Sequence, residues 1–273
     1  MVAMRNVVAM TAGAFAFVTG SGCYWLDLYS DLSGGSGASG DAGGDADATD
    51  ASVGGRFCAT RTPAPTFCAD FDEGRSLSSD WGVVQEGPPG ALVIDRDAGT
   101  SAPASLRASV PAVSNGPQSL EYVARAFTVT KRLAVEFDAR ADTLGSSAGQ
   151  VTLVAIYAHD SAAMVDRSLI HYVTSLSAQI EEEEAPPFQS WPHALANAPP
   201  LGQWVHHELR MDLVNGGAVL TLKIANATVL DAIVLGQAWS AGEYRVTFGL
   251  AYINNDAGAP WSFHYDNIAV NVE

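Results

Sequence analysis

Arg132-Leu133-Ala134-Val135-Glu136-Phe137-Asp138-Ala139-Arg140 alternates between apolar and charged side chains. Its odd-numbered residues are all apolar, and its even-numbered residues are charged apart from Ala134. Because successive side chains of a β-strand point to opposite faces, this stretch would bury one face and expose the other. The stretch therefore predicts a long, half-buried strand.

The same period of two recurs along the chain. Residues 205–213 repeat it, and Asn215-Gly216-Gly217 then provides a hairpin turn before a further strand at residues 219–224. No long stretch has helical periodicity, and only residues 161–168 are expected to form a helical turn. Short strands between Gly, Pro and Asn turns predict an all-β fold, an antiparallel β-sandwich or jelly roll. Three more strands are expected, at residues 151–157, 244–252 and 268–272.

Four groups of residues resemble concanavalin A-like (laminin G and glucanase-type) jelly rolls, in the order and spacing of that family. The resemblance covers most of residues 68–273. It implies two curved antiparallel sheets, with the concave face as the usual glycan-binding surface. The groups are Phe71-Asp72-Glu73-Gly74 with Ser79-Asp80-Trp81, Ser105-Leu106-Arg107, Gly202-Gln203-Trp204-Val205-His206-His207-Glu208-Leu209, and Phe263-His264-Tyr265-Asp266-Asn267-Ile268-Ala269-Val270.

The chain begins with an apolar leader, residues 1–22, which is too short to span a membrane and suits a secretory signal. Gly20-Ser21-Gly22-Cys23 resembles a bacterial lipobox, which implies lipidation of Cys23. Residues 23–55 are mostly Gly, Ser, Ala, Asp and Thr, so they predict a flexible, disordered linker. Residues 56–273 are expected to form the β-sandwich domain. We therefore expect an exported protein, lipid-anchored to the bacterial outer membrane or cell surface.

Charge and cysteines narrow the choice of partners. From residue 56 onward the chain has 24 acidic and 13 basic residues, after the six acidic and one basic residues before it are subtracted from totals of 30 and 14. Nucleic acid is not expected as a partner, because it requires clustered Lys and Arg. A membrane is expected to be reached through the lipid anchor only. Cys58 and Cys68 can close a short loop, and a disulfide is favoured over free thiols.

The chain partly matches two catalytic patterns of jelly-roll enzymes, and in each case the chain lacks a residue that the pattern requires. Glycosidases of this fold carry Glu-x-Asp-x-x-Glu, whereas Glu136 and Asp138 are followed by Ala141. His206-His207-Glu208-Leu209-Arg210 is similar to the Arg-x-Glu-Leu-Arg strand of alginate lyases, but His206 replaces the first arginine. In Gln179-Ile180-Glu181, a glutamate replaces the histidine of those lyases. An enzyme is therefore disfavoured.

Metal binding is expected from the resemblance alone. In related jelly rolls the first and last strands can share a structural calcium ion, and Asp70 or Asp72 with Asp266 match those positions. Calcium prefers several hard oxygen ligands, which carboxylates supply. The alternative is that Asp266 and Asn267 form hydrogen bonds at a strand bend. Asp72 and Asp266 are our candidate calcium ligands.

Exposed aromatic rings next to amide and carboxylate groups would suit a sugar ligand. Trp191 lies in a Pro-rich segment expected to be a loop, and a second loop is expected to follow the strand that ends near Tyr252. Packing of these loops against the domain is the alternative. The four acids at residues 181–184 are expected to form a solvated loop. The candidate ligand-binding residues are Trp191, Tyr252, Asn254, Asn255, Asp256 and Trp261.

These observations favour a non-catalytic, lipid-anchored surface domain that binds a glycan or matrix component. A structural or adhesive domain with a surface protein as partner is the alternative. A glycoside hydrolase or polysaccharide lyase with a degenerate motif comes third.

Overall fold

The structure is a computed structural model that describes residues 57–101, 103–112, 120–145, 149–195, 197–251, 253–254 and 259–273, with only the backbone of residues 253–254. The expected leader, lipidation site Cys23 and linker lie outside the described residues. No helix among the described residues is long and apolar enough to cross a membrane.

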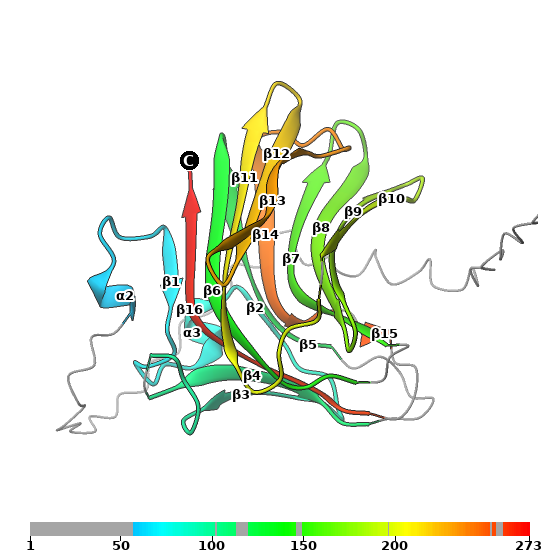
Figure 1. The fold of residues 1–273 in the computed structure, drawn as a ribbon. Helices are drawn as coiled ribbons and strands as arrows, with labels where there is room; N and C mark the ends of the chain where they lie inside the picture. Colours follow the sequence, from blue (N-terminus) through cyan, green and yellow to red (C-terminus); the bar gives the residue numbers. More distant parts are fainter. Residues whose placement is uncertain are drawn as a thin grey trace, which may run out of the picture. The chain divides into compact units, whose positions relative to one another are not determined.

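Two antiparallel sheets form a sandwich, as Figure 1 shows. We call them sheet A and sheet B. In sheet A, the strands follow the order β13 (Ala227–Val234), β12 (Gly217–Ile224), β11 (Trp204–Val214), β6 (Arg132–Thr143), β16 (Trp261–Val272), β4 (Ser105–Val110) and β3 (Ala91–Asp95), and β1 (Phe67–Ala69) also pairs with β16. In sheet B, the order is β10 (Gln189–Leu195), β9 (Ala178–Ala185), β8 (Val165–Thr174), β7 (Gln150–Asp160), β14 (Gly242–Leu250), β5 (Glu121–Val129) and β2 (Val83–Gln85), and β15 (Ile253–Asn254) also pairs with β7.

The alternating stretch at residues 132–140 forms the first part of β6 and sets the two faces of sheet A. Leu133, Val135 and Phe137 are at most 1% exposed and belong to the core, whereas Glu136 lies on the outward face. The predicted hairpin joins β11 to β12, with Asn215 and Gly216 at positive φ in the turn. The predicted all-β sandwich is therefore confirmed.

Three local predictions were wrong. Residues 161–168 form a turn followed by the start of β8, without a helix. The four acids at residues 181–184 lie within β9, where Glu182 and Glu183 are buried, so they are not a solvated loop. Trp191 lies within the strand β10 and not in the expected loop. The neighbouring Pro192 is compatible with a strand here, because β10 is at the edge of its sheet, where a missing backbone N–H is tolerated.

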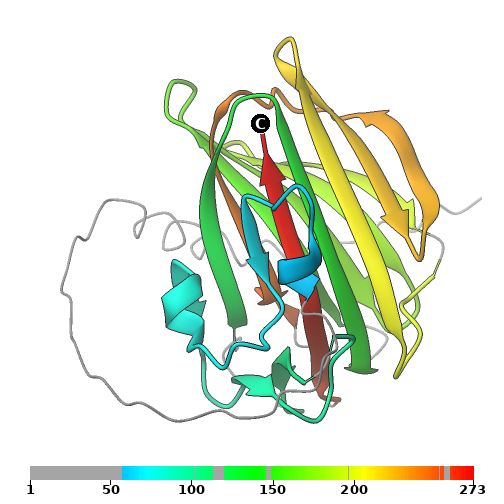
Figure 2. The ribbon, with the colours of Figure 1, turned by 90° about the vertical axis from the view of Figure 1, so that its left-hand side faces the viewer.

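The segment that begins at residue 57 is attached to sheet A, because its strand β1 pairs with β16. Figure 2 shows β1 lying along β16. The helical turn α2 (Phe57–Thr60) precedes β1, and α3 (Leu77–Asp80) follows it. The predicted disulfide between Cys58 and Cys68 is present and closes the loop between α2 and β1. Arg61 within this loop forms an ion pair with Glu136 of β6. The loop therefore has both a covalent and an ionic attachment.

Candidate functional site

The outward face of sheet B carries a line of polar side chains that crosses five neighbouring strands. Val246 and Phe248 of β14 pack in the core, so the residues between them point outward. Residues opposite one another in neighbouring strands share a face, and the register links one residue from each of β14, β7, β8, β9 and β10. We call this set the polar row: Arg245, Tyr157, Ser168, Glu183 and Ser190.

Glu183 is the one carboxyl group of the polar row, and its pKa is shifted from the ordinary value. The Tyr172 hydroxyl donates to its Oε1 at 3.3 Å, and the Ser168 hydroxyl donates to its Oε2 at 3.5 Å. Burial, and then the nearby charge of Glu181, raise the pKa of Glu183 to about 7. Desolvation disfavours the charged form of a carboxyl group, which explains the direction. Glu183 can therefore gain or lose a proton near neutral pH.

Two hydroxyl groups beside the polar row have no hydrogen-bond partner. Thr247 lies two residues after Arg245 on the same face of β14, and Thr152 of β7 is opposite Tyr172. Both residues are at most 1% exposed, and the Oγ1 atoms of both are unpaired. Buried polar atoms usually have a partner in the protein or in ordered solvent. The hydrogen-bonding capacity of these two buried hydroxyls is therefore unused in this structure.

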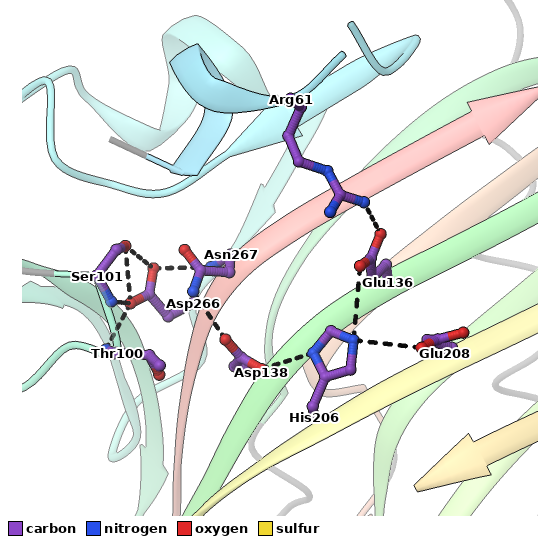
Figure 3. Close-up of polar contacts among 9 residues, drawn as sticks. All are labelled: Arg61, Thr100, Ser101, Glu136, Asp138, His206, Glu208, Asp266 and Asn267. Atoms are coloured by element: carbon purple, nitrogen blue, oxygen red, sulfur yellow. Dashed lines mark hydrogen bonds and ion pairs between the residues drawn. The ribbon is translucent and has the colours of Figure 1, made fainter. Parts of the chain in front are cut away.

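A second polar cluster lies on the outward face of sheet A, and Figure 3 shows its contacts. His206 of β11 lies between two acids of β6, with Nδ1 2.8 Å from Asp138 Oδ1 and Nε2 3.5 Å from Glu136 Oε1. These hydrogen bonds, with Asp138 contributing most, raise the pKa of His206 to about 10. His206 is therefore a cation at neutral pH, and the two acids of the glycosidase-like pattern are its partners.

The cluster continues from Asp138 to the last strand. Asn267 donates its side-chain amide to Asp138 at 2.7 Å and its backbone N–H to Asp266 at 2.7 Å (Figure 3). Asp266 also accepts the backbone N–H groups of Thr100 and Ser101 at 2.7 and 2.9 Å. Burial raises the pKa of Asp266 to about 7, although these donors lower it. Asp138 and Asp266 therefore both have hydrogen-bond partners within the protein. Through these bonds the cluster connects β6, β11 and β16 to the loop that contains Thr100 and Ser101.

No family model and no curated protein matches this chain. Its structure is similar to that of an endo-β-1,4-glucuronan lyase from the fungus Trichoderma reesei, with 13% identity and a TM-score of 0.62 over 77% of this chain and 96% of that chain. The chain has a concanavalin A-like jelly-roll fold.

Two further jelly rolls of known structure have similar coverage. The cellulose-induced protein Cip1 has 15% identity and a TM-score of 0.53, over 76% of this chain and 97% of its own. The alginate lyase vAL-1 from Chlorella virus has 9% identity and a TM-score of 0.51, over 77% of this chain and 100% of its own. Similarity at such low identity establishes the jelly-roll fold and leaves activity to be argued from the site.

The two tryptophans expected to bind a ligand lie in different sheets, Trp191 in β10 of sheet B and Trp261 in β16 of sheet A. Trp261 is 2% exposed and packs so closely on Gly145 that a Cβ there would lie 2.2 Å from its ring. Its ring is therefore closed to a ligand. Trp191 is partly exposed at the edge of sheet B. Tyr252, Asn255 and Asp256, with the side chain of Asn254, lie outside the described residues.

The two expected calcium ligands of the jelly roll hold the same loop. Asp72 Oδ1 accepts the backbone N–H of Ala104 at 3.0 Å, and Asp266 accepts those of Thr100 and Ser101. These contacts supply N–H donors where calcium would require oxygen ligands. Within the described ranges, no group of three or more His, Cys, Asp or Glu side chains is placed to hold a metal ion. The calcium site stays a prediction.

Proposed function

We propose that this protein binds a polysaccharide along the polar row of sheet B. The observation that carries the proposal is the row itself, in which five adjacent strands each present one polar side chain to the same face. Four gaps of about 4.8 Å between neighbouring strands give the row a length of about 19 Å. An extended ligand, rather than a single small molecule, matches this length.

The chemical groups of the polar row suit sugar hydroxyls, which both donate and accept hydrogen bonds. Arg245 donates, Glu183 accepts when ionised, and the Tyr157 hydroxyl can do both, whereas the Ser168 hydroxyl donates to Glu183 and can only accept from a sugar. A few convergent polar groups with an aromatic neighbour are typical of a ligand site. The names of the similar jelly rolls support a polysaccharide by analogy of fold only.

Cleavage of the bound polysaccharide is the second candidate function, and one observation favours it. Glu183 has a pKa of about 7 and receives a hydrogen bond from the Tyr172 hydroxyl. A carboxyl group with such a pKa exchanges protons efficiently at neutral pH, as acid–base catalysis requires. Simple binding needs no such group. The two functions share the face and differ in whether Glu183 must change its protonation state.

Attachment to a membrane is part of the proposal and rests on the sequence. Lipidation of Cys23 would place the domain at the bacterial surface, with residues 24–55 as its tether. Labelling of the wild-type chain with a radioactive fatty acid, and loss of the label in Cys23→Ser, would support this part. Equal labelling of both chains would contradict it.

Screening the full chain on an array of plant, algal and bacterial polysaccharides tests the main proposal. We expect selective binding that Glu183→Gln and Tyr157→Phe each weaken at least several-fold. Glu184→Gln is the matched control, because Glu184 is the next residue, points to the other face and pairs with Arg167. Appearance of shorter chains that depends on Glu183 would favour cleavage. A folded protein that binds nothing would favour the structural or adhesive alternative.

A further inference from the structure

The strand β10 forms one edge of sheet B and carries a partly exposed tryptophan immediately after the polar row. Ser190 is the last member of the row and points outward, where its hydroxyl donates to Glu181. Trp191 follows it, pairs with Glu182 and therefore points to the other side of the strand. Because β10 is an edge strand, this side can be reached around the edge from the outward face.

Gly236 supports the face of the Trp191 ring. A Cβ added to Gly236 would lie 3.2 Å from Nε1, 3.3 Å from Cδ1 and 3.3 Å from Cε2 of the indole. A point beside the edge of the ring would be clearly nearer to Nε1 than to its two neighbours, so these nearly equal distances place Gly236 beneath the ring face. Glycine is the residue that lets the ring lie this close to the backbone.

Glu182 fixes the position of this support. Its side chain is fully buried, and Oε2 accepts the backbone N–H groups of Gly236 at 2.9 Å and Gln237 at 3.4 Å. Its other oxygen lies 2.9 Å from His193 Nε2, two residues along β10 from Trp191. Hydrogen bonds to both oxygens of one carboxyl group hold that side chain in a single orientation. The ring and the imidazole are therefore held in place before any ligand arrives.

We propose that Trp191 and His193 form an edge subsite, at which one pyranose ring of the bound polysaccharide stacks on the indole. The inference rests on the proposed function, since a chain lying along the polar row reaches β10 last and meets Trp191 at the edge. The apolar C–H face of the sugar covers the ring face opposite Gly236. His193 offers a hydrogen bond to a ring hydroxyl. A rigid aromatic surface with a polar neighbour binds at little cost in conformational entropy.

Affinity electrophoresis of the full chain, through gels containing the polysaccharide that the array identifies, tests the subsite. We expect Trp191→Ala to weaken retardation by about tenfold, because the sugar loses the rigid aromatic surface on which it packs. Gly236→Ala should weaken it by a few-fold, because the added methyl group lifts the ring. Trp204→Ala is the matched control: Trp204 is also partly exposed, but the Arg140 guanidinium lies 5.2 Å from its ring centre on sheet A.

The outcomes separate the subsite from the polar row. Normal binding by Trp191→Ala, together with loss of binding by Glu183→Gln, would overturn the edge subsite and leave the proposed function intact. No retardation of the wild-type chain by any polysaccharide would overturn both. Because a variant could misfold, wild type and Trp191→Phe are also compared by acrylamide quenching. Protection of tryptophan fluorescence by the polysaccharide in wild type alone supports the subsite, and equal protection in both overturns it.

Discussion

His171 and His207 face each other in the core, with ring centroids 5.5 Å apart and one ring contributed by each sheet. The His207 ring also stacks on Phe137 at 4.8 Å. Both histidines are at most 3% exposed, and both nitrogens of His207 lack a hydrogen-bond partner. Buried imidazoles without partners are stable only when neutral. The two sheets are thus joined across a pair that cannot easily accept a proton.

Acid should weaken the domain through this pair. Burial lowers the pKa of His171 from 6.5 to about 4, so the unfolded chain binds a proton that the folded chain refuses. The domain is not destabilised by His171 above the unfolded pKa of 6.5, and it loses free energy of unfolding as the pH falls from 6.5 towards about 4. We expect His171 to account for about 2 kcal/mol of lost unfolding free energy at about pH 5. Urea unfolding at about pH 7.5 and about pH 5 measures this loss, and His171→Gln should reduce it. An unchanged pH dependence in that variant would contradict the assignment.

Glu183 should have the opposite effect on stability. Its pKa is raised in the folded state, so its contribution is present below the unfolded value of 4.5 and is lost as the pH rises through about 7. Glu183→Gln removes the buried charge and should stabilise the protein by roughly 2–3 kcal/mol at about pH 8, with little effect at about pH 4.5. Thermal unfolding at both pH values measures this, with Glu184→Gln as control. Stabilisation of equal size at both pH values would contradict the pKa shift.

The sandwich could be predicted from the sequence, because the alternation of apolar and polar residues indicates which face of each strand is buried. In β6, Leu133, Val135 and Phe137 fill the core as the period of two requires. The disulfide was also predicted, since Cys58 and Cys68 are close in sequence. These features depend on local pattern alone.

The polar row could not be predicted in the same way, because its members come from five separate strands. The acids at residues 181–184 resemble a solvated segment in sequence. In the structure Glu182 is buried, and its carboxyl group accepts hydrogen bonds from the backbone N–H groups of Gly236 and Gln237. Those partners lie more than 50 residues away. The regular spacing of Ala178 and Ile180 before the acids was the available signal, since it continues the alternation into β9.

Calcium, if it binds where the resemblance places it, should stabilise the loop that Asp72 and Asp266 hold. We expect a melting temperature several degrees higher with millimolar calcium than with a chelator, because a ligand that binds only the folded state stabilises it. Asp266→Asn should remove the difference. Differential scanning calorimetry of the full chain measures both. Identical melting temperatures with calcium and with chelator would end the calcium prediction.

His206 should stabilise the domain at neutral pH by joining β11 to the acids of β6. Its pKa is raised to about 10, so this contribution is complete below the unfolded value of 6.5 and disappears as the pH rises through about 10. Since its side chain is 28% exposed, solvent screening reduces the expected loss in His206→Gln to about 1 kcal/mol at about pH 7.

His159→Gln is the matched control for this ion pair. His159 also contacts an aspartate, with Nδ1 2.6 Å from Asp166 Oδ1, but its side chain is 39% exposed, against 28% for His206. Solvent should cancel most of that interaction, so its loss should change stability by less than about 0.5 kcal/mol. Urea unfolding of both variants at about pH 7 makes the comparison. Equal losses would mean that the second acid and the lower exposure of His206 add nothing, and that the cluster in Figure 3 is an ordinary surface ion pair.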